Sequence, residues 1–207
     1  MSTVILVHGT WGAKWAQPDS EFRKMLVRQR FFIAPAFEWS GDISGIPSLT
    51  ANGKHSDWRA GGASLSYFLR DIPYVNRNVI AHSHGGQCVA YCAAFFKTPI
   101  RRLITVSTPP REDMESVWAA AKPSVGYHVH VTAKKGDWMI RWGQVFDSRW
   151  GWDSTLPSAD QNLVLPDIGH SGILMDPLFI PLWQREHLLD VFRMDDAMLH
   201  ARKPSYV

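Results

Sequence analysis

The sequence predicts an α/β fold, a three-layer α/β/α sandwich built on a mostly parallel sheet of roughly six strands. Short apolar runs alternate with longer helix-like stretches along most of the chain. This alternation is typical of a parallel sheet with helices on both faces. The first run, residues 3–8, is apolar at nearly every position, as expected for a strand buried on both faces. Glycines and polar residues follow several runs, where ligands bind in open α/β sheets.

Each element is predicted from its local pattern. The apolar runs predict strands at residues 3–8, 31–37, 78–82, 102–107, 127–133 and 162–166. The longer periodic stretches predict helices at residues 19–30, 57–71, 85–97, 112–121 and 178–193. Residues 40–55 and 138–161 follow neither period and are expected to form loops. The 207 residues contain no repeat and no linker, so residues 1–207 are predicted to form a single domain.

The segment VIAHSHGGQ, residues 79–87, is the most informative part of the chain. An apolar run ends at Ser83 and a helix-like stretch follows at once. This order predicts a sharp strand–turn–helix with Ser83 at its apex, the geometry called a nucleophile elbow. The turn is so tight that the residues two before and two after the serine must be small. Ala81 and Gly85 meet that requirement, although the usual signature has glycine at both positions.

A second segment predicts donors for an oxyanion hole. The first strand leads into His8-Gly9-Thr10, the start of a glycine-containing loop. Acyl-transfer hydrolases need two backbone N–H groups aimed at the developing oxyanion. One comes from the residue after the nucleophile, here His84, and the other from a loop after an earlier strand, here Thr10.

A base and an acid follow Ser83 in the order that such a site requires. Asp137 comes just after the strand predicted at 127–133, and His170 comes after the strand predicted at 162–166. The carboxyl ends of parallel strands share one edge of a sheet, so the three side chains can converge there. Asp137 is preferred to Asp147, Asp153 and Asp167 because it directly follows a predicted strand and a glycine. The fallback acids are Glu112 and Asp113, which follow the preceding strand.

Taken together, these segments resemble the α/β-hydrolase superfamily, and within it the small bacterial lipases and esterases. The matching segments are HGTWG at 8–12, AHSHGG at 81–86, GD at 136–137 and GH at 169–170. The resemblance implies a minimal α/β-hydrolase fold without the two antiparallel strands that open larger relatives. It also implies that Ser83 is the nucleophile, His170 the base and Asp137 the orienting acid, and that no cofactor is required.

Two histidine pairs suggest a metal site, but neither pair is sufficient. His82 and His84 could begin an H-x-H-x-D-H run, yet the next two positions hold Gly86 and Gln87. Residues 128 and 130 are both histidines that alternate along a strand and face the same way, and two ligands do not complete a metal site. We therefore predict no metal, and we expect these sheet histidines to pack beneath a helix.

The chain has ten tryptophans, a large number for its length. Several fall in loops after predicted strands, on the edge where ligands bind. With Ile173, which follows the predicted base, they could line an apolar acyl pocket; core packing is the alternative. The candidate substrate-binding residues are Trp11, Trp138, Trp142, Trp152 and Ile173. The expected partner is a small-molecule ester with an apolar acyl group.

Charge and cysteine content exclude other classes of protein. The net charge of +3 is not gathered into a basic stripe, so nucleic-acid binding is not expected. Cys88 and Cys92 lie four apart on a predicted helix, where a disulfide would be strained. Free thiols and the lack of a charged-then-apolar leader before Val4 predict a cytoplasmic protein. No apolar run approaches the length of a transmembrane span.

The sequence therefore predicts a serine hydrolase that cleaves carboxylic esters through an acyl-enzyme intermediate. The same triad can also serve a thioesterase, an amidase or an acyltransferase, and the residues do not separate these activities. A non-catalytic binding protein on the same scaffold is a further alternative.

Overall fold

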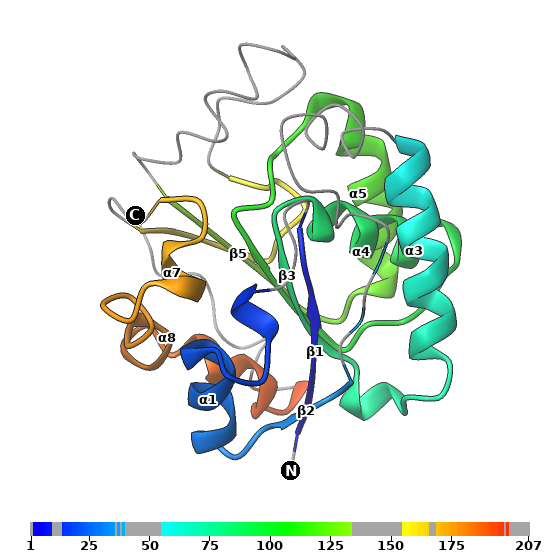
Figure 1. The fold of residues 1–207 in the computed structure, drawn as a ribbon. Helices are drawn as coiled ribbons and strands as arrows, with labels where there is room; N and C mark the ends of the chain where they lie inside the picture. The colour runs from blue at the N-terminus through cyan, green and yellow to red at the C-terminus, as the bar shows by residue number, and fades with distance from the viewer. Residues whose placement is uncertain are drawn as a thin grey trace.

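The computed structural model describes residues 2–9, 14–35, 37, 39, 55–133, 155–165, 169–196 and 198 of the chain. Its centre is a six-stranded sheet with the order β2-β1-β3-β4-β5-β6, in which every neighbouring pair is parallel (Figure 1). The strands are β1 (Thr3–Val7), β2 (Phe32–Ile33), β3 (Asn78–His82), β4 (Arg102–Val106), β5 (His128–Ala133) and β6 (Gln161–Leu165). The predicted fold class is confirmed.

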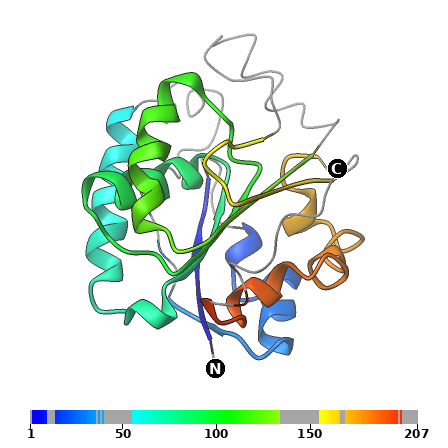
Figure 2. The same ribbon diagram turned by 180° about the vertical axis from the view of Figure 1, so that it is seen from behind.

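Helices cover both faces of the sheet, and Figures 1 and 2 show the two layers from opposite sides. One layer contains η1 (Lys14–Ala16), α1 (Glu21–Arg28), α7 (Gly172–Met175), α8 (Leu182–Arg185) and η5 (Leu188–Phe192). The other contains α3 (His55–Leu69), α4 (His84–Phe95) and α5 (Glu115–Ala121). Three short 3-10 turns lie between elements: η2 (Tyr74–Asn76), η3 (Glu112–Met114) and η4 (Lys122–Ser124).

The first strand is apolar along most of its length because it is buried on both faces of the sheet. Val4 and Leu6 of β1 belong to the hydrophobic cluster beneath α1, whereas Ile5 and Val7 belong to the cluster beneath α3 and α4. Successive side chains on a strand point to opposite faces, so β1, β3 and β4 each supply both clusters. This double burial explains the continuous apolar runs in the sequence.

Helices α3 and α4 pack closely where α3 carries two adjacent glycines. A Cβ atom at Gly62 would lie 2.8 Å from the backbone nitrogen of Cys92, and one at Gly61 would lie 2.7 Å from Cys88 Sγ. Cys88 and Cys92 are free and buried, as expected. Burial also raises the pKa of Cys92 to about 12, which leaves this thiol protonated and unreactive.

The single helix predicted at 178–193 is wrong, because this stretch forms two short elements. Helix α8 begins only after Pro181, whose ring cannot donate a backbone hydrogen bond. His187 then adopts the left-handed conformation, with φ of 54°, and separates α8 from η5. The apolar periodicity survives this break, and residues such as Trp183 and Phe192 are fully buried in the cluster beneath α1.

The strand predicted at 31–37 is much shorter than its apolar run. Among the described residues of this stretch, Phe32–Ile33 pair with β1, and one further bridge joins Val7 to Phe37. Pro35 lies between these two pairings and has no N–H group for the ladder. The edge position of β2 tolerates this interruption.

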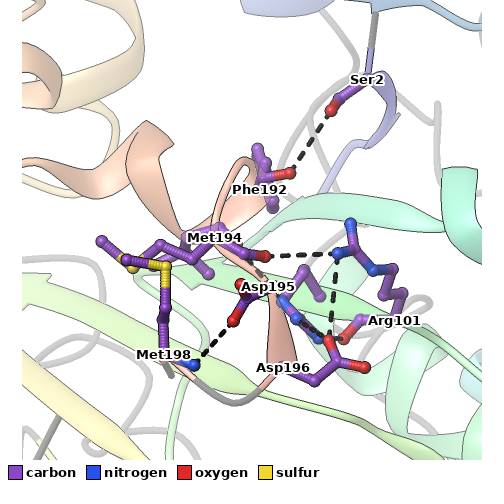
Figure 3. Close-up of polar contacts among 9 residues, drawn as sticks. Ser2, Arg101, Phe192, Met194, Asp195, Asp196 and Met198 are labelled. Atoms are coloured by element: carbon purple, nitrogen blue, oxygen red, sulfur yellow. Dashed lines mark hydrogen bonds and ion pairs between the residues drawn. The ribbon is translucent and has the colours of Figure 1, made fainter. Parts of the chain in front are cut away.

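The C-terminal segment is tied to the amino-terminal edge of the sheet, opposite the edge reached by Ser83. Arg102, which is almost fully buried, pairs with Asp196 and donates from Nε to the carbonyl of Val191 at 3.3 Å. Arg101 donates to the carbonyl of Met194 at 3.3 Å, and Ser2 donates to Phe192 at 3.3 Å (Figure 3). Among the described residues, no helix is long and apolar enough to cross a membrane.

Candidate active site

Ser83 forms the junction between β3 and α4. The strand ends at His82, the helix begins at His84, and Ser83 between them has φ of 53° and ψ of −131°. Non-glycine residues rarely adopt positive φ, and such conformations cluster at functional sites. The Ser83 N–H donates to the carbonyl of Val106 at 2.9 Å, and Gly86 donates to the Ser83 carbonyl at 3.0 Å. The strand–turn–helix geometry expected around Ser83 is therefore present.

The residues around the turn are small because atoms at the ends of the neighbouring strands leave no space for larger side chains. A Cβ atom at Gly85 would lie 2.4 Å from the carbonyl oxygen of His8, and one at Gly86 would lie 2.1 Å from Thr108 Oγ1. Ala81 is fully buried. The start of α4 thus sits between the ends of β1 and β4.

The loop after β1 begins in direct contact with Ser83. A Cβ atom at Gly9 would lie 2.7 Å from Ser83 Cβ and 3.3 Å from Ser83 Oγ. His8 holds this position: its Nδ1 lies 2.7 Å from the Gly9 oxygen, and Trp39 donates from Nε1 to the His8 carbonyl at 2.8 Å. Thr10, the expected second oxyanion donor, lies outside the described residues.

His170 lies against the end of β3, close to the elbow. It follows Gly169, which has φ of 55°, and precedes Ser171, the N-cap of α7. The His170 ring is 4.9 Å from the ring of His82, and its backbone oxygen is 3.2 Å from His82 Nε2. The structure thus brings His170 to the sheet edge that carries Ser83. Asp137 lies outside the described residues, so its role as the acid stays a prediction.

The alternative acid Asp113 is engaged elsewhere. Arg111 binds its carboxylate with two hydrogen bonds of 2.9 and 2.7 Å, and His55 Nε2 lies 3.1 Å from the same group. Burial opposes ionisation of Asp113, but these hydrogen bonds outweigh it and lower the pKa. Asp113 therefore ties the loop after β4 to α3, on the sheet face opposite His82. Glu112, the other alternative, is exposed.

The side chain of His84 is neutral and packed. Its ring lies 5.3 Å from that of Trp58. Burial, with the nearby charge of Arg111 and the neighbouring His170, lowers the pKa of His84 to about 3. The imidazole of His84 is therefore uncharged at neutral pH, and its backbone N–H at the start of α4 is the group oriented by the elbow.

His128 and His130 of the sheet share one threonine as a hydrogen-bond partner. Thr105 Oγ1 lies 2.8 Å from His128 Nε2 and 2.9 Å from His130 Nδ1, and the His128 ring stacks on Trp118 of α5 at 5.2 Å. Burial lowers the pKa of both histidines, to about 4 for His130. Within the described part of the chain, no three His, Cys, Asp or Glu side chains group as metal ligands.

The residues expected to bind substrate are mostly beyond the described parts. Trp11, Trp138, Trp142 and Trp152 lie outside them. Ile173 is described and is buried in the cluster beneath α1. Its role in an acyl pocket stays a prediction. A cavity of about 810 Å³ lies between α5 and residues 155–159, with Arg111, Trp118 and Leu156 in its wall. Neither Ser83 nor His170 belongs to its described lining.

The family of the protein is shown by a comparison of its sequence with models of known protein families. A sequence model of the alpha/beta hydrolase fold family matches residues 3–127, more than half of the chain. The protein therefore belongs to the α/β-hydrolase fold family. A comparison with the sequences of curated proteins finds no relative.

Several solved structures share this fold at low sequence identity. The predicted CIB-like hydrolase from Thermoplasma acidophilum is 13% identical over 91% of this chain and 86% of its own, with a TM-score of 0.58. Mature lipase BlEst2 from Bacillus licheniformis is 16% identical over 89% and 91%, with a TM-score of 0.58. The methylesterase MES16 from Arabidopsis is 16% identical over 91% and 100%, with a TM-score of 0.51. At these identities the likeness establishes the fold.

Proposed function

We propose that the protein is a serine hydrolase that cleaves carboxylic esters through an acyl-enzyme. The observation that carries this proposal is the backbone of Ser83, held at positive φ between a buried strand and a helix, with Gly9 against its side chain. Such strain persists only where the surrounding structure enforces it. A hydroxyl presented in this way at the carboxyl edge of a parallel sheet suits nucleophilic attack.

In the proposed reaction, the Ser83 hydroxyl attacks the ester carbonyl carbon while His170 takes its proton. The tetrahedral intermediate carries an oxyanion, which the backbone N–H groups of His84 and Thr10 stabilise. The positive end of the α4 dipole favours the same charge. The carbon–oxygen bond to the alcohol then breaks, His170 returns the proton to the leaving alcohol, and the acyl group stays on Ser83.

Deacylation repeats these steps with water. His170 takes a proton from the attacking water, the bond to Ser83 Oγ breaks, and the proton returns to the serine as the acid leaves. Asp137 would hold the imidazole in the required tautomer and stabilise the imidazolium. The substrate would be a small or medium ester with an apolar acyl group. The names of the lipase and methylesterase among the similar structures support esters as the first class to test.

The test combines a covalent probe with a graded set of substrates. A fluorophosphonate should label the wild-type protein once, and peptide mapping should place the label on Ser83. Hydrolysis of p-nitrophenyl esters should fall by on the order of 10⁴–10⁶ in kcat in Ser83→Ala. Unlabelled protein, or more than a few per cent of activity in a clean Ser83→Ala preparation, would remove Ser83 from the mechanism.

A further inference from the structure

His82 is a buried histidine next to Ser83 that the proposed reaction does not use. It occupies the last position of β3 and is 7% exposed. Its side chain points to the face covered by α1 and α7, where the Trp15 ring lies 6.2 Å away, edge-on. One ring nitrogen, Nε2, lies 3.2 Å from the backbone oxygen of His170 and 3.1 Å from Ser171 Oγ. A single atom therefore contacts two consecutive residues of the loop that carries the proposed base, residues 169–171, which we call the base loop.

The acceptors around Nε2 determine the tautomer of His82. A backbone carbonyl can only accept a hydrogen bond, so Nε2 must carry the proton and donate it. The Ser171 hydroxyl oxygen accepts from the same N–H group. Burial, together with the neighbouring His170, lowers the pKa of His82 well below its ordinary value. The ring is therefore neutral, with its proton on Nε2.

The base loop needs such a contact because its local structure is weak. Gly169 occupies the left-handed region, and glycine is the residue with the most conformational freedom to lose. Helix α7, which follows at Gly172, has only four residues, too few to be stable without tertiary packing. β3, in contrast, is a central strand whose five residues are all buried.

We propose that His82 is a positioning residue that fastens the base loop to the strand carrying the nucleophile. Its N–H group fixes the backbone of His170 and the side chain of Ser171, and its ring packs against the His170 ring at 4.9 Å. The loop and the elbow then form one rigid unit, which sets the separation of the His170 imidazole from Ser83 Oγ. This inference rests on the proposed function.

The expected effect of losing this contact is on turnover. A displacement of about 1 Å between reacting groups can cost on the order of 10²-fold in rate. Removing the Nε2 donor should therefore lower kcat by on the order of 10- to 100-fold. KM should be nearly unchanged, because the proposed contact positions the base and does not bind substrate. The same loss should appear in the rate of labelling by a fluorophosphonate.

Three substitutions separate the donor from the volume of the side chain. His82→Gln places an amide N–H close to the position of Nε2, His82→Asn carries the same amide one methylene short, and His82→Leu fills the space with no donor. His130→Leu is the matched control: His130 is also a buried sheet histidine, but it contacts Thr105 and not the base loop. Labelling rates, kcat, KM and melting temperature are measured for all of them.

We expect His82→Gln to stay within about threefold of wild type, while the Asn and Leu variants lose at least about tenfold in kcat and labelling rate. Folded His130→Leu should be labelled at the wild-type rate. Wild-type protein that is not labelled at Ser83 would overturn the proposed function and this inference together. Labelled wild type with equally fast Asn and Leu variants would overturn the role of His82 alone. If His82→Leu does not fold, the Gln and Asn pair decides, and equal rates for these two would overturn the role.

Discussion

Gly9 lies directly against Ser83, so that a Cβ atom at residue 9 would stand 2.7 Å from Ser83 Cβ. The contact joins the loop after β1 to the turn after β3, two strands that pair as neighbours through Val7 and Ala81. Here glycine is required for space and not for its backbone angles. The close approach keeps the loop that leads to Thr10 beside the hydroxyl of Ser83.

Gly9→Ala should therefore damage both stability and activity. Because the methyl group would overlap Ser83 Cβ, the elbow and the loop must move apart. We expect a loss of stability of about 1–3 kcal/mol, as for overpacked cores, and a fall of at least about tenfold in kcat/KM for p-nitrophenyl butyrate.

Gly126→Ala is the matched control for this variant. A Cβ there would lie 2.7 Å from the Arg101 oxygen, a similar clash at the opposite edge of the sheet. It should lower the urea midpoint without a selective fall in kcat. Wild-type kcat/KM in Gly9→Ala would contradict the steric argument.

Ser83 should be held in its conformation at a cost to stability. A residue in a sparsely populated φ/ψ region costs about 1–3 kcal/mol, and glycine avoids much of it. We expect both Ser83→Gly and Ser83→Ala to be inactive, with the glycine variant the more stable by on the order of 1 kcal/mol in thermal or urea unfolding. An alanine variant at least as stable as the glycine variant would show that the turn is not strained.

Substitution of Asp137 and of Asp113, one at a time, should show which of the two acts as the triad acid and which forms a structural ion pair. Asp137→Asn should lower kcat by about 10⁴-fold, because the imidazole of His170 would lose the partner that sets its tautomer. Asp113→Asn breaks the contacts to Arg111 and His55, so it should lower the melting temperature and leave kcat within a fewfold of wild type. The reverse pattern would place the acid on the loop after β4.

Acid should destabilise the protein through its buried histidines. His82, His84, His128 and His130 have lowered pKa values, about 3 for His84 and about 4 for His130, chiefly because burial disfavours the charged ring. Above the unfolded-state pKa of ~6.5 both states are neutral, so this contribution is fully present. As pH falls towards 4, only the unfolded state gains protons, and each histidine removes on the order of 1 kcal/mol per pH unit.

Unfolding in urea between pH 7 and 4.5 tests this expectation. The free energy of unfolding should fall steeply below pH 6.5, and His130→Gln should reduce the slope by about one proton. A free energy of unfolding that does not change across this range would show that these rings take up protons in the folded state as readily as in the unfolded state.

Acyl chain length should affect the rate if the loop tryptophans form the pocket. Each buried methylene contributes roughly 0.8 kcal/mol, so kcat/KM should rise about threefold to fourfold per added carbon until the pocket is full. Trp138→Ala and Trp152→Ala should flatten this dependence and spare acetyl esters. An unaltered chain-length profile in both variants would assign these tryptophans to structural packing.

Local sequence was sufficient for the central strands and for the elbow. β3 and β4 lie within one residue of their expected bounds, because a strand buried on both faces has a near-continuous apolar run. The elbow was recognisable because its steric demands confine residues 81, 85 and 86 to small side chains. The C-terminal helix was predicted wrongly, since apolar periodicity does not report the backbone break at Pro181 and His187.

The sequence by itself determined the sheet's central strands and the residue types that the elbow requires, since both follow from constraints between near neighbours in the chain. Only the tertiary structure decided the partners of His82 and Asp113. His82 alone looks like half of a metal site, and Asp113 looks like an alternative acid. Their roles depend on residues brought from distant segments, His170 and Ser171 for one and His55 for the other. Hydrogen bonds form only between atoms about 3 Å apart. Which residues from distant segments come that close cannot be inferred from their positions in the sequence.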